Sequence, residues 1–122
     1  MLANGQTIRV DKTGHTLGLL TVGTYGPIGG TGTVRYSDGS TQNFSISDPD
    51  WQDPAAPSSA DVAVTTPYHN HAGSGRVTRS TYLFFHGVRL DPAKKVALVT
   101  LPAVSSAVTG APALHVFAVA VD

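Results

Sequence analysis

The most constraining feature of this sequence is its set of short apolar stretches, which glycine and proline interrupt along the whole chain. The 122 residues include 13 Gly and 8 Pro, and turn signals recur about every 8–12 residues, a spacing typical of β-sandwiches and barrels. Glutamate is absent, while threonine, valine, serine, alanine and glycine are abundant. Because glutamate favours helices and β-branched residues favour strands, the sequence predicts an all-β chain.

The segments between turn signals predict eight or nine strands and no helix. The predicted strands cover residues 6–10, 17–25, 32–36, 41–46, 61–66, 76–85 with a continuation over 87–90, 96–101 and 114–121. The Asp38-Gly39 pair lies between two alternating segments and predicts a hairpin, because glycine supplies the positive φ that the turn requires. Two long polar loops are expected over Ser47–Ser59 and Pro67–Gly75.

Alternation within the 76–85 segment predicts that its side chains divide between two faces. Val77, Leu83 and Phe85 share one face, and the intervening residues lie on the other. A chain of this length fits one domain and can bury a core without a metal or a disulfide. We therefore expect residues 1–122 to form a single antiparallel β-sandwich, and we expect a monomer.

Charge and cysteine content exclude several classes of function. The formal net charge is zero and the pI is about 7.0, which gives no electrostatic basis for binding nucleic acid or an anionic membrane surface. The chain has no cysteine, so disulfides, thiolate metal sites and cysteine nucleophiles are excluded. It has no apolar run of 18 residues, which predicts no membrane insertion. No signal peptide is visible at the start, and we expect a mature fragment.

The residue types needed for hydrolysis do not occur in a catalytic pattern. No G-x-S-x-G nucleophile motif is present. Paired carboxylates for glycoside cleavage would have to be aspartates. Asp48, Asp50 and Asp53 cluster, but they lie in a proline-broken loop where aspartates usually form turns and caps. We expect no enzyme activity and no catalytic residue.

Metal and cofactor sites are also not expected, although two alternatives stay open. His69 and His71 are two residues apart, a spacing that places both side chains on one face of a strand, and His86 or an aspartate could be a third ligand. The loop aspartates could bind calcium, although they lack the glycine and the final glutamate of an EF-hand loop. The sequence predicts no metal and no cofactor.

The aromatic residues of the two long loops give the best candidate for a binding site. Trp51, the single tryptophan, follows Asp50 in the first loop, and Tyr68, His69 and Asn70 open the second. Flat aromatic faces stack on sugar rings, and nearby planar polar groups bind hydroxyls. If the loops meet at one end of the sandwich, these five residues form a carbohydrate-binding platform. The alternative is that Trp51 packs over the sandwich edge.

An ordered set of short strings resembles one family. The strings are Tyr36-Ser37-Asp38-Gly39-Ser40-Thr41-Gln42-Asn43-Phe44, Asp50-Trp51, Pro67-Tyr68-His69-Asn70, Leu90-Asp91-Pro92, Lys95-Val96, Val99-Thr100-Leu101-Pro102 and Leu114-His115-Val116-Phe117-Ala118. They resemble a C-terminal β-sandwich module of secreted bacterial glycoside hydrolases, fucosidase-like and mannosidase-like enzymes among them, and the resemblance covers residues 5–121.

The resemblance implies an ancillary, non-catalytic domain of a secreted or cell-surface protein, similar to galactose-binding-like or immunoglobulin-like sandwiches. A glycan is then the expected partner. The alternative is a structural or interaction domain, or a surface antigen, with no small-molecule ligand. The exposure of Trp51 distinguishes a glycan-binding module from a domain without a ligand. A ring that stacks on a ligand must be accessible, whereas a ring that packs on the protein is shielded.

Overall fold

The computed structural model describes residues 1–53, 55 and 60–122, and within these residues it contains strands and no helix. The prediction of an all-β chain is confirmed, with ten strands in place of the expected eight or nine. The strands are β1 (Thr7–Thr13), β2 (Thr16–Thr24), β3 (Ile28–Tyr36), β4 (Thr41–Asp48), β5 (Asp61–Thr66), β6 (His69–His71), β7 (Gly75–Val77), β8 (Thr81–Arg89), β9 (Lys95–Thr100) and β10 (Ala113–Val121).

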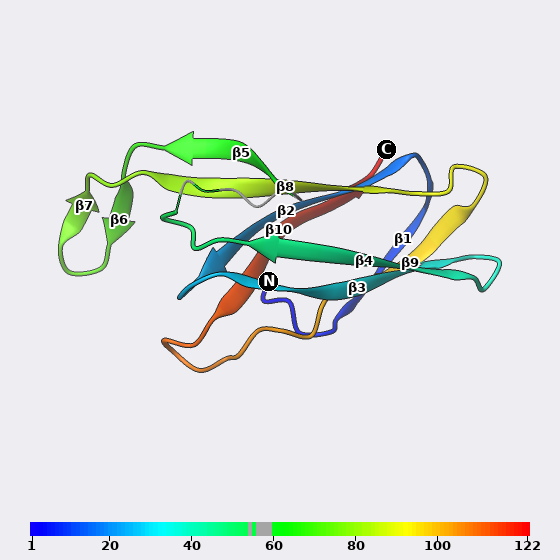
Figure 1. Ribbon diagram of the computed structural model, residues 1–122, viewed down its shortest axis with the longest axis horizontal. Coiled ribbons are helices and arrows are strands. Elements are labelled where there is room, and N and C mark those ends of the chain that lie inside the picture. The colour runs from blue at the N-terminus through cyan, green and yellow to red at the C-terminus, as the bar shows by residue number, and fades with distance from the viewer. Residues whose placement is uncertain (54, 56–59) are drawn as a thin grey trace.

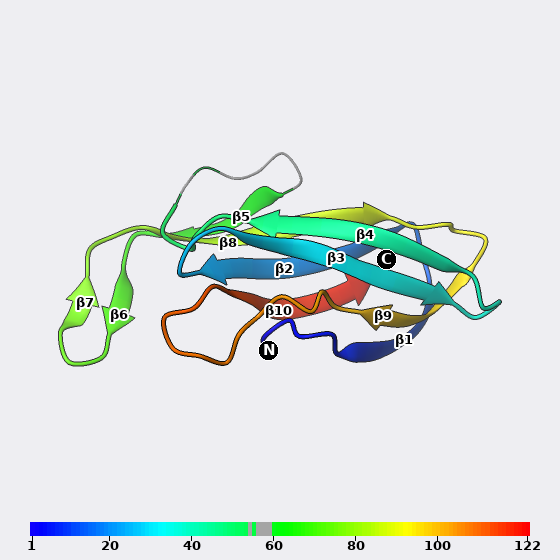
Figure 2. The same cartoon turned by 60° about the horizontal axis from the view of Figure 1, so that its bottom comes forward.

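Two four-stranded sheets pack face to face, so the predicted β-sandwich is confirmed (Figures 1 and 2). The first sheet has the order β1-β9-β3-β4 and the second has the order β10-β2-β8-β5. All strand pairs within them are antiparallel. The remaining strands, β6 and β7, form a separate hairpin that extends beyond one end of the sandwich (Figure 1).

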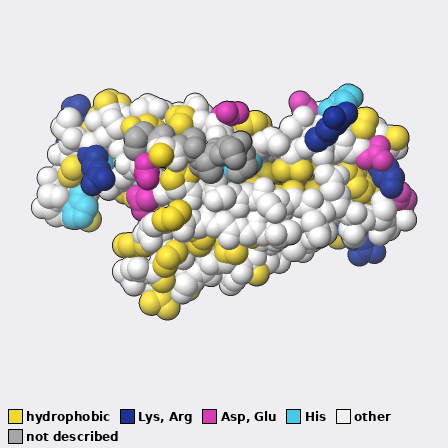
Figure 3. Space-filling model, viewed as in Figure 1, with side chains coloured by type: hydrophobic (Ala, Val, Ile, Leu, Met, Phe, Trp, Pro, Cys, Tyr) yellow, Lys and Arg dark blue, Asp and Glu magenta, His cyan; other side chains and the backbone are white. Residues whose placement is uncertain are grey.

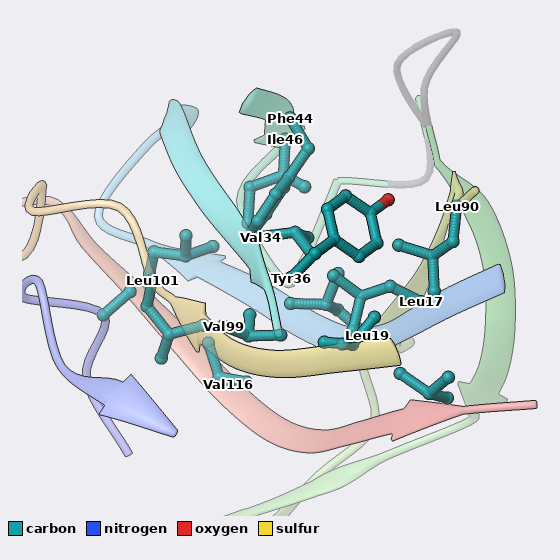
Figure 4. Packing of buried hydrophobic residues seen from close by; sticks show 14 residues of the cluster. Leu17, Leu19, Val34, Tyr36, Phe44, Ile46, Leu90, Val99, Leu101 and Val116 are labelled. Carbon is teal, nitrogen blue, oxygen red and sulfur yellow. The ribbon is translucent and has the colours of Figure 1, made fainter. Parts of the chain in front are cut away.

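The core fills the space between the two sheets (Figure 4). Its fully or nearly fully buried residues come from both sheets and include Leu17, Leu19, Val34, Tyr36, Phe44, Ile46, Val96, Val99, Leu101, Leu114 and Val116. Burying one large apolar side chain contributes about 1.5–3 kcal/mol. This shared apolar layer is what holds the two sheets together.

The hairpin predicted at Asp38-Gly39 is confirmed. Strands β3 and β4 pair in continuous register from Ile28 opposite Asp48 to Arg35 opposite Thr41. Gly39 has φ of 88°, the left-handed conformation that glycine adopts without steric cost. The Asp38 carboxylate accepts hydrogen bonds from the hydroxyl and the backbone N–H of Ser40, at 2.6 and 2.9 Å.

These contacts predict the titration of Asp38. The Ser40 hydrogen bonds, with Lys94 Nζ at 3.1 Å, lower the pKa of Asp38 from 3.8 to about 2. Because the pKa is depressed in the folded state, the stabilisation is present above pH 4 and is lost as the pH falls from about 4 to about 2. We expect an NMR titration midpoint near 2, and a midpoint closer to 3.8 in Ser40→Ala. A wild-type midpoint of 3.8 would contradict this prediction.

The core face of β8 is the one that carries Phe84 and His86. Phe84 and His86 point into the core and are 0% and 1% exposed, whereas Phe85 is 36% exposed on the opposite face. The run Tyr82-Leu83-Phe84-Phe85 is apolar throughout, so it contains no alternation from which the register could be read. Phe85 packs instead over Gly18 of β2, where an added Cβ would lie 2.9 Å from its ring.

The second predicted loop and the strand after it also need correction. Pro67–Gly75 is not an open loop, because His69–His71 forms β6 and pairs with Gly75–Val77. The predicted strand 76–85 is therefore split between β7 and β8, which belong to different sheets. The first predicted loop, Ser47–Ser59, begins later than expected because Ser47 and Asp48 extend β4; residues 54 and 56–59 lie outside the described residues.

Candidate functional site

The chain crosses from the first sheet to the second directly after β4, and this crossing positions Trp51. Trp51 donates its backbone N–H to the carbonyl of Gly23 in β2, and its own carbonyl accepts the N–H of Tyr82 in β8, both at 2.8 Å. Asp50 forms an isolated parallel bridge with Gly23. At this point β2 and β8 no longer pair with each other, so the Asp50-Trp51 segment is hydrogen-bonded to both strands.

Asp50 orients the turn that follows. Its Oδ2 accepts the backbone N–H of Gly26 at 3.1 Å, and its Oδ1 accepts the N–H of Gln52 at 3.0 Å. Each carboxylate oxygen can accept more than one hydrogen bond. Asp50 therefore joins the β2–β3 turn to the Trp51 turn while keeping acceptor capacity for a ligand hydroxyl.

A hollow of about 460 Å³ opens beside Trp51. We call it the Trp51 hollow. Its lining residues are Thr24, Tyr25, Asp50, Trp51, Gln52 and His115. Tyr25 is 59% exposed and has φ of 60°, a conformation uncommon for residues other than glycine. The hollow thus combines two aromatic side chains with a carboxylate, an amide, a hydroxyl and an imidazole.

The imidazole of His115 contributes an uncharged polar group. Its Nε2 lies 3.1 Å from the hydroxyl of Thr24, across the β2–β10 pair. Burial lowers the pKa of His115, and the nearby N-terminal ammonium group of Met1 lowers it further. Because the ordinary histidine pKa is already about 6.5, His115 is neutral at pH 7. Its ring offers hydrogen bonding without attracting ions.

A second hollow, of about 430 Å³, lies on the same segment. We call it the Arg79 hollow, and its lining residues are Asp50, Gln52, Asp53 and Arg79. It shares Asp50 and Gln52 with the Trp51 hollow. The Asp50–Gln52 segment therefore has an aromatic hollow on one side and a charged hollow on the other.

The structure brings together three of the five predicted site residues. Asp50 and Trp51 line the Trp51 hollow, and the ring of His69 meets the Trp51 ring edge-on, with centroids 4.8 Å apart. Tyr68 and Asn70 do not line it. Tyr68 is covered instead by the guanidinium of Arg76, 4.0 Å above its ring, at the end of the molecule where Figure 3 shows exposed histidine and basic side chains.

Sequence reasoning missed four residues of the Trp51 hollow, namely Thr24, Tyr25, Gln52 and His115. Tyr25 precedes Gly26-Pro27, and an aromatic residue at a glycine-proline turn is a signal that could have been used. His115 is 91 residues from Thr24 in the chain. Only the pairing of β10 with β2 brings them together, and the sequence does not reveal strand order.

The described part of the chain contains no group of three or more histidine and aspartate side chains arranged to hold a metal ion. His69 contacts Trp51, His71 Nδ1 lies 2.8 Å from the hydroxyl of Ser74, and His86 is buried beside Asp48. The three histidines of the alternative metal site thus have three different surroundings.

No known protein family matches the chain, and no curated protein sequence matches it. Among the described residues there is also no helix with the length and apolar character to cross a membrane.

Proposed function

We propose that this chain is a non-catalytic module that binds a carbohydrate in the Trp51 hollow. The supporting observation is the composition of that hollow: Tyr25 and Trp51 offer aromatic faces, and Asp50, Gln52 and His115 offer planar hydrogen-bonding groups. Sugar rings have apolar faces that stack on aromatic rings and hydroxyl edges that bond to carboxylates and amides. The volume of about 460 Å³ is within the usual range for small-ligand sites.

The backbone around Trp51 supports the same proposal. Hydrogen bonds to Gly23 and Tyr82 fix the segment to two strands of the second sheet. A binding residue held on strands keeps its geometry better than one on a free loop, so less ordering is needed when a ligand binds. The resemblance to modules of secreted glycoside hydrolases points to the same class of ligand and to a secreted or cell-surface parent protein.

The test is saccharide binding followed through Trp51. We expect Trp51→Ala to weaken binding at least about tenfold, because it removes both the buried area and about 0.5–1.5 kcal/mol of aromatic interaction. Isothermal titration against a panel of neutral oligosaccharides measures the loss. Tyr68→Ala is the matched control, because Tyr68 lies outside the hollow beneath Arg76, and it should bind like the wild type. Absence of binding to any saccharide at millimolar concentration would contradict the proposal.

A second candidate function is an interaction domain without a small ligand. Exposed apolar side chains favour it: Phe117 and Val64 are 65% and 47% exposed, and Phe85 is 36% exposed. These side chains come from β10, β5 and β8 of the second sheet, and exposed apolar residues that form a contiguous patch mark protein contacts. Blank saccharide titrations, together with weaker partner binding by Phe117→Ser, would support this candidate over the first.

A further inference from the structure

A buried hydrogen-bonded pair, Asp48 and His86, lies between the two sheets. Asp48, the last residue of β4, is 0% exposed and His86 of β8 is 1% exposed. His86 Nε2 lies 2.6 Å from Asp48 Oδ1. This short contact joins one imidazole nitrogen to one carboxyl oxygen. Within the described residues, the other carboxylate oxygen of Asp48 has no hydrogen-bond partner.

Stability alone does not account for this pair. Removing two ionisable groups from water is costly, and apolar side chains of similar volume often stabilise a core equally well. The pair is also unusual in a chain with few charged residues. We therefore ask which neighbouring segment the Asp48–His86 contact holds in position between the two sheets.

The Asp48–His86 pair lies at the start of the segment that leads to Trp51. Asp48 is followed directly by Pro49, Asp50 and Trp51, the crossing that carries the Trp51 hollow. The crossing has two attachments to β8: Asp48 to His86 at its start, and the Trp51 carbonyl to Tyr82 at its end.

Glycine makes the close approach of this crossing possible. A Cβ on Gly23 would lie 2.6 Å from the carbonyl oxygen of Pro49, a distance at which backbone would have to move. The segment between Asp48 and Trp51 is thus packed directly on β2 and tied at both ends to β8. We therefore expect a shift of Asp48 to be transmitted along this segment to Trp51.

We propose that the Asp48–His86 pair is a positioning device that holds the indole of Trp51 in place along the hollow. Its role in ligand affinity rests on the proposed carbohydrate-binding function, but its role in placing Trp51 does not. Asp48 and His86 would then be positioning residues that act through the crossing without contacting the ligand.

The test follows the single tryptophan directly. In His86→Leu we expect a shifted indole N–H resonance, a raised acrylamide quenching constant and roughly tenfold weaker saccharide binding. Asp48→Asn keeps an acceptor for the His86 N–H and should therefore retain the wild-type indole signal. The control is Val96→Ala, which removes a fully buried core side chain that pairs with Tyr36, remote from Trp51. It should lower stability and leave the indole unchanged.

The possible results separate this inference from the proposed function. If His86→Leu folds with the indole resonance and quenching of the wild type, the inference is overturned. If His86→Leu does not fold, the double variant Asp48→Leu/His86→Leu takes its place, because it removes both polar groups and refills their volume. A wild-type indole resonance and quenching constant in that double variant would also overturn the inference. If the indole moves as expected but the wild type binds no saccharide, the positioning role stands and the carbohydrate proposal fails.

Discussion

Phe84→Ala is expected to lower the free energy of unfolding by about 3–5 kcal/mol, the usual loss when a fully buried phenylalanine is truncated. Phe84 is 0% exposed and comes from a central strand of the second sheet. Truncation leaves a cavity in the interior that the surrounding side chains only partly close. Urea denaturation monitored by circular dichroism measures the loss.

Two other phenylalanines are the controls. Phe117 is 65% exposed, and its replacement by alanine should change the free energy of unfolding by no more than about 0.5 kcal/mol. Phe85→Ala should have an intermediate effect, because Phe85 covers Gly18 on the outer face. If Phe85→Ala were more destabilising than Phe84→Ala, the register of β8 described above would be wrong.

His86→Leu is the second change with a large expected effect. It leaves the carboxyl group of Asp48 buried without its imidazole partner, and removing one member of a buried Asp–His pair costs about 3–5 kcal/mol. Asp48→Leu/His86→Leu should be much less destabilising, because neither member is then left buried without its partner. A double-mutant cycle in urea measures both values. The cycle also needs Asp48→Leu alone, and a loss in the double variant equal to the sum of the two single losses would show that the pair has no coupling energy.

The fold class could be predicted from the sequence because each local signal agreed with the others. Asp38-Gly39 lies between two alternating segments and defined a hairpin, which the pairing of β3 with β4 confirms. The register of β8 could not be predicted in the same way. With Leu83 and Phe85 apolar as well as Phe84, both faces of the strand look like a core face, and only its pairing with β2 and β5 decides between them.

The candidate site was predictable in part for a similar reason. Asp50 and Trp51 are neighbours in the chain, so the sequence could propose them together. Tyr25 and His115 join them only through the pairing of β10 with β2 and the insertion of Trp51 beside Gly23. Tyr68 was assigned to the site because it is aromatic and lies in a polar segment, whereas its actual partner is Arg76, eight positions further along the same hairpin.

The β6–β7 hairpin has a consequence for how this scaffold can diversify. None of its residues belongs to the core cluster, and its strands pair with each other and with no strand of the sandwich. Exposed segments of this kind tolerate insertions and deletions. Relatives of this chain could therefore exchange or lengthen the hairpin next to Trp51, and so acquire new specificities, while inheriting the same two sheets.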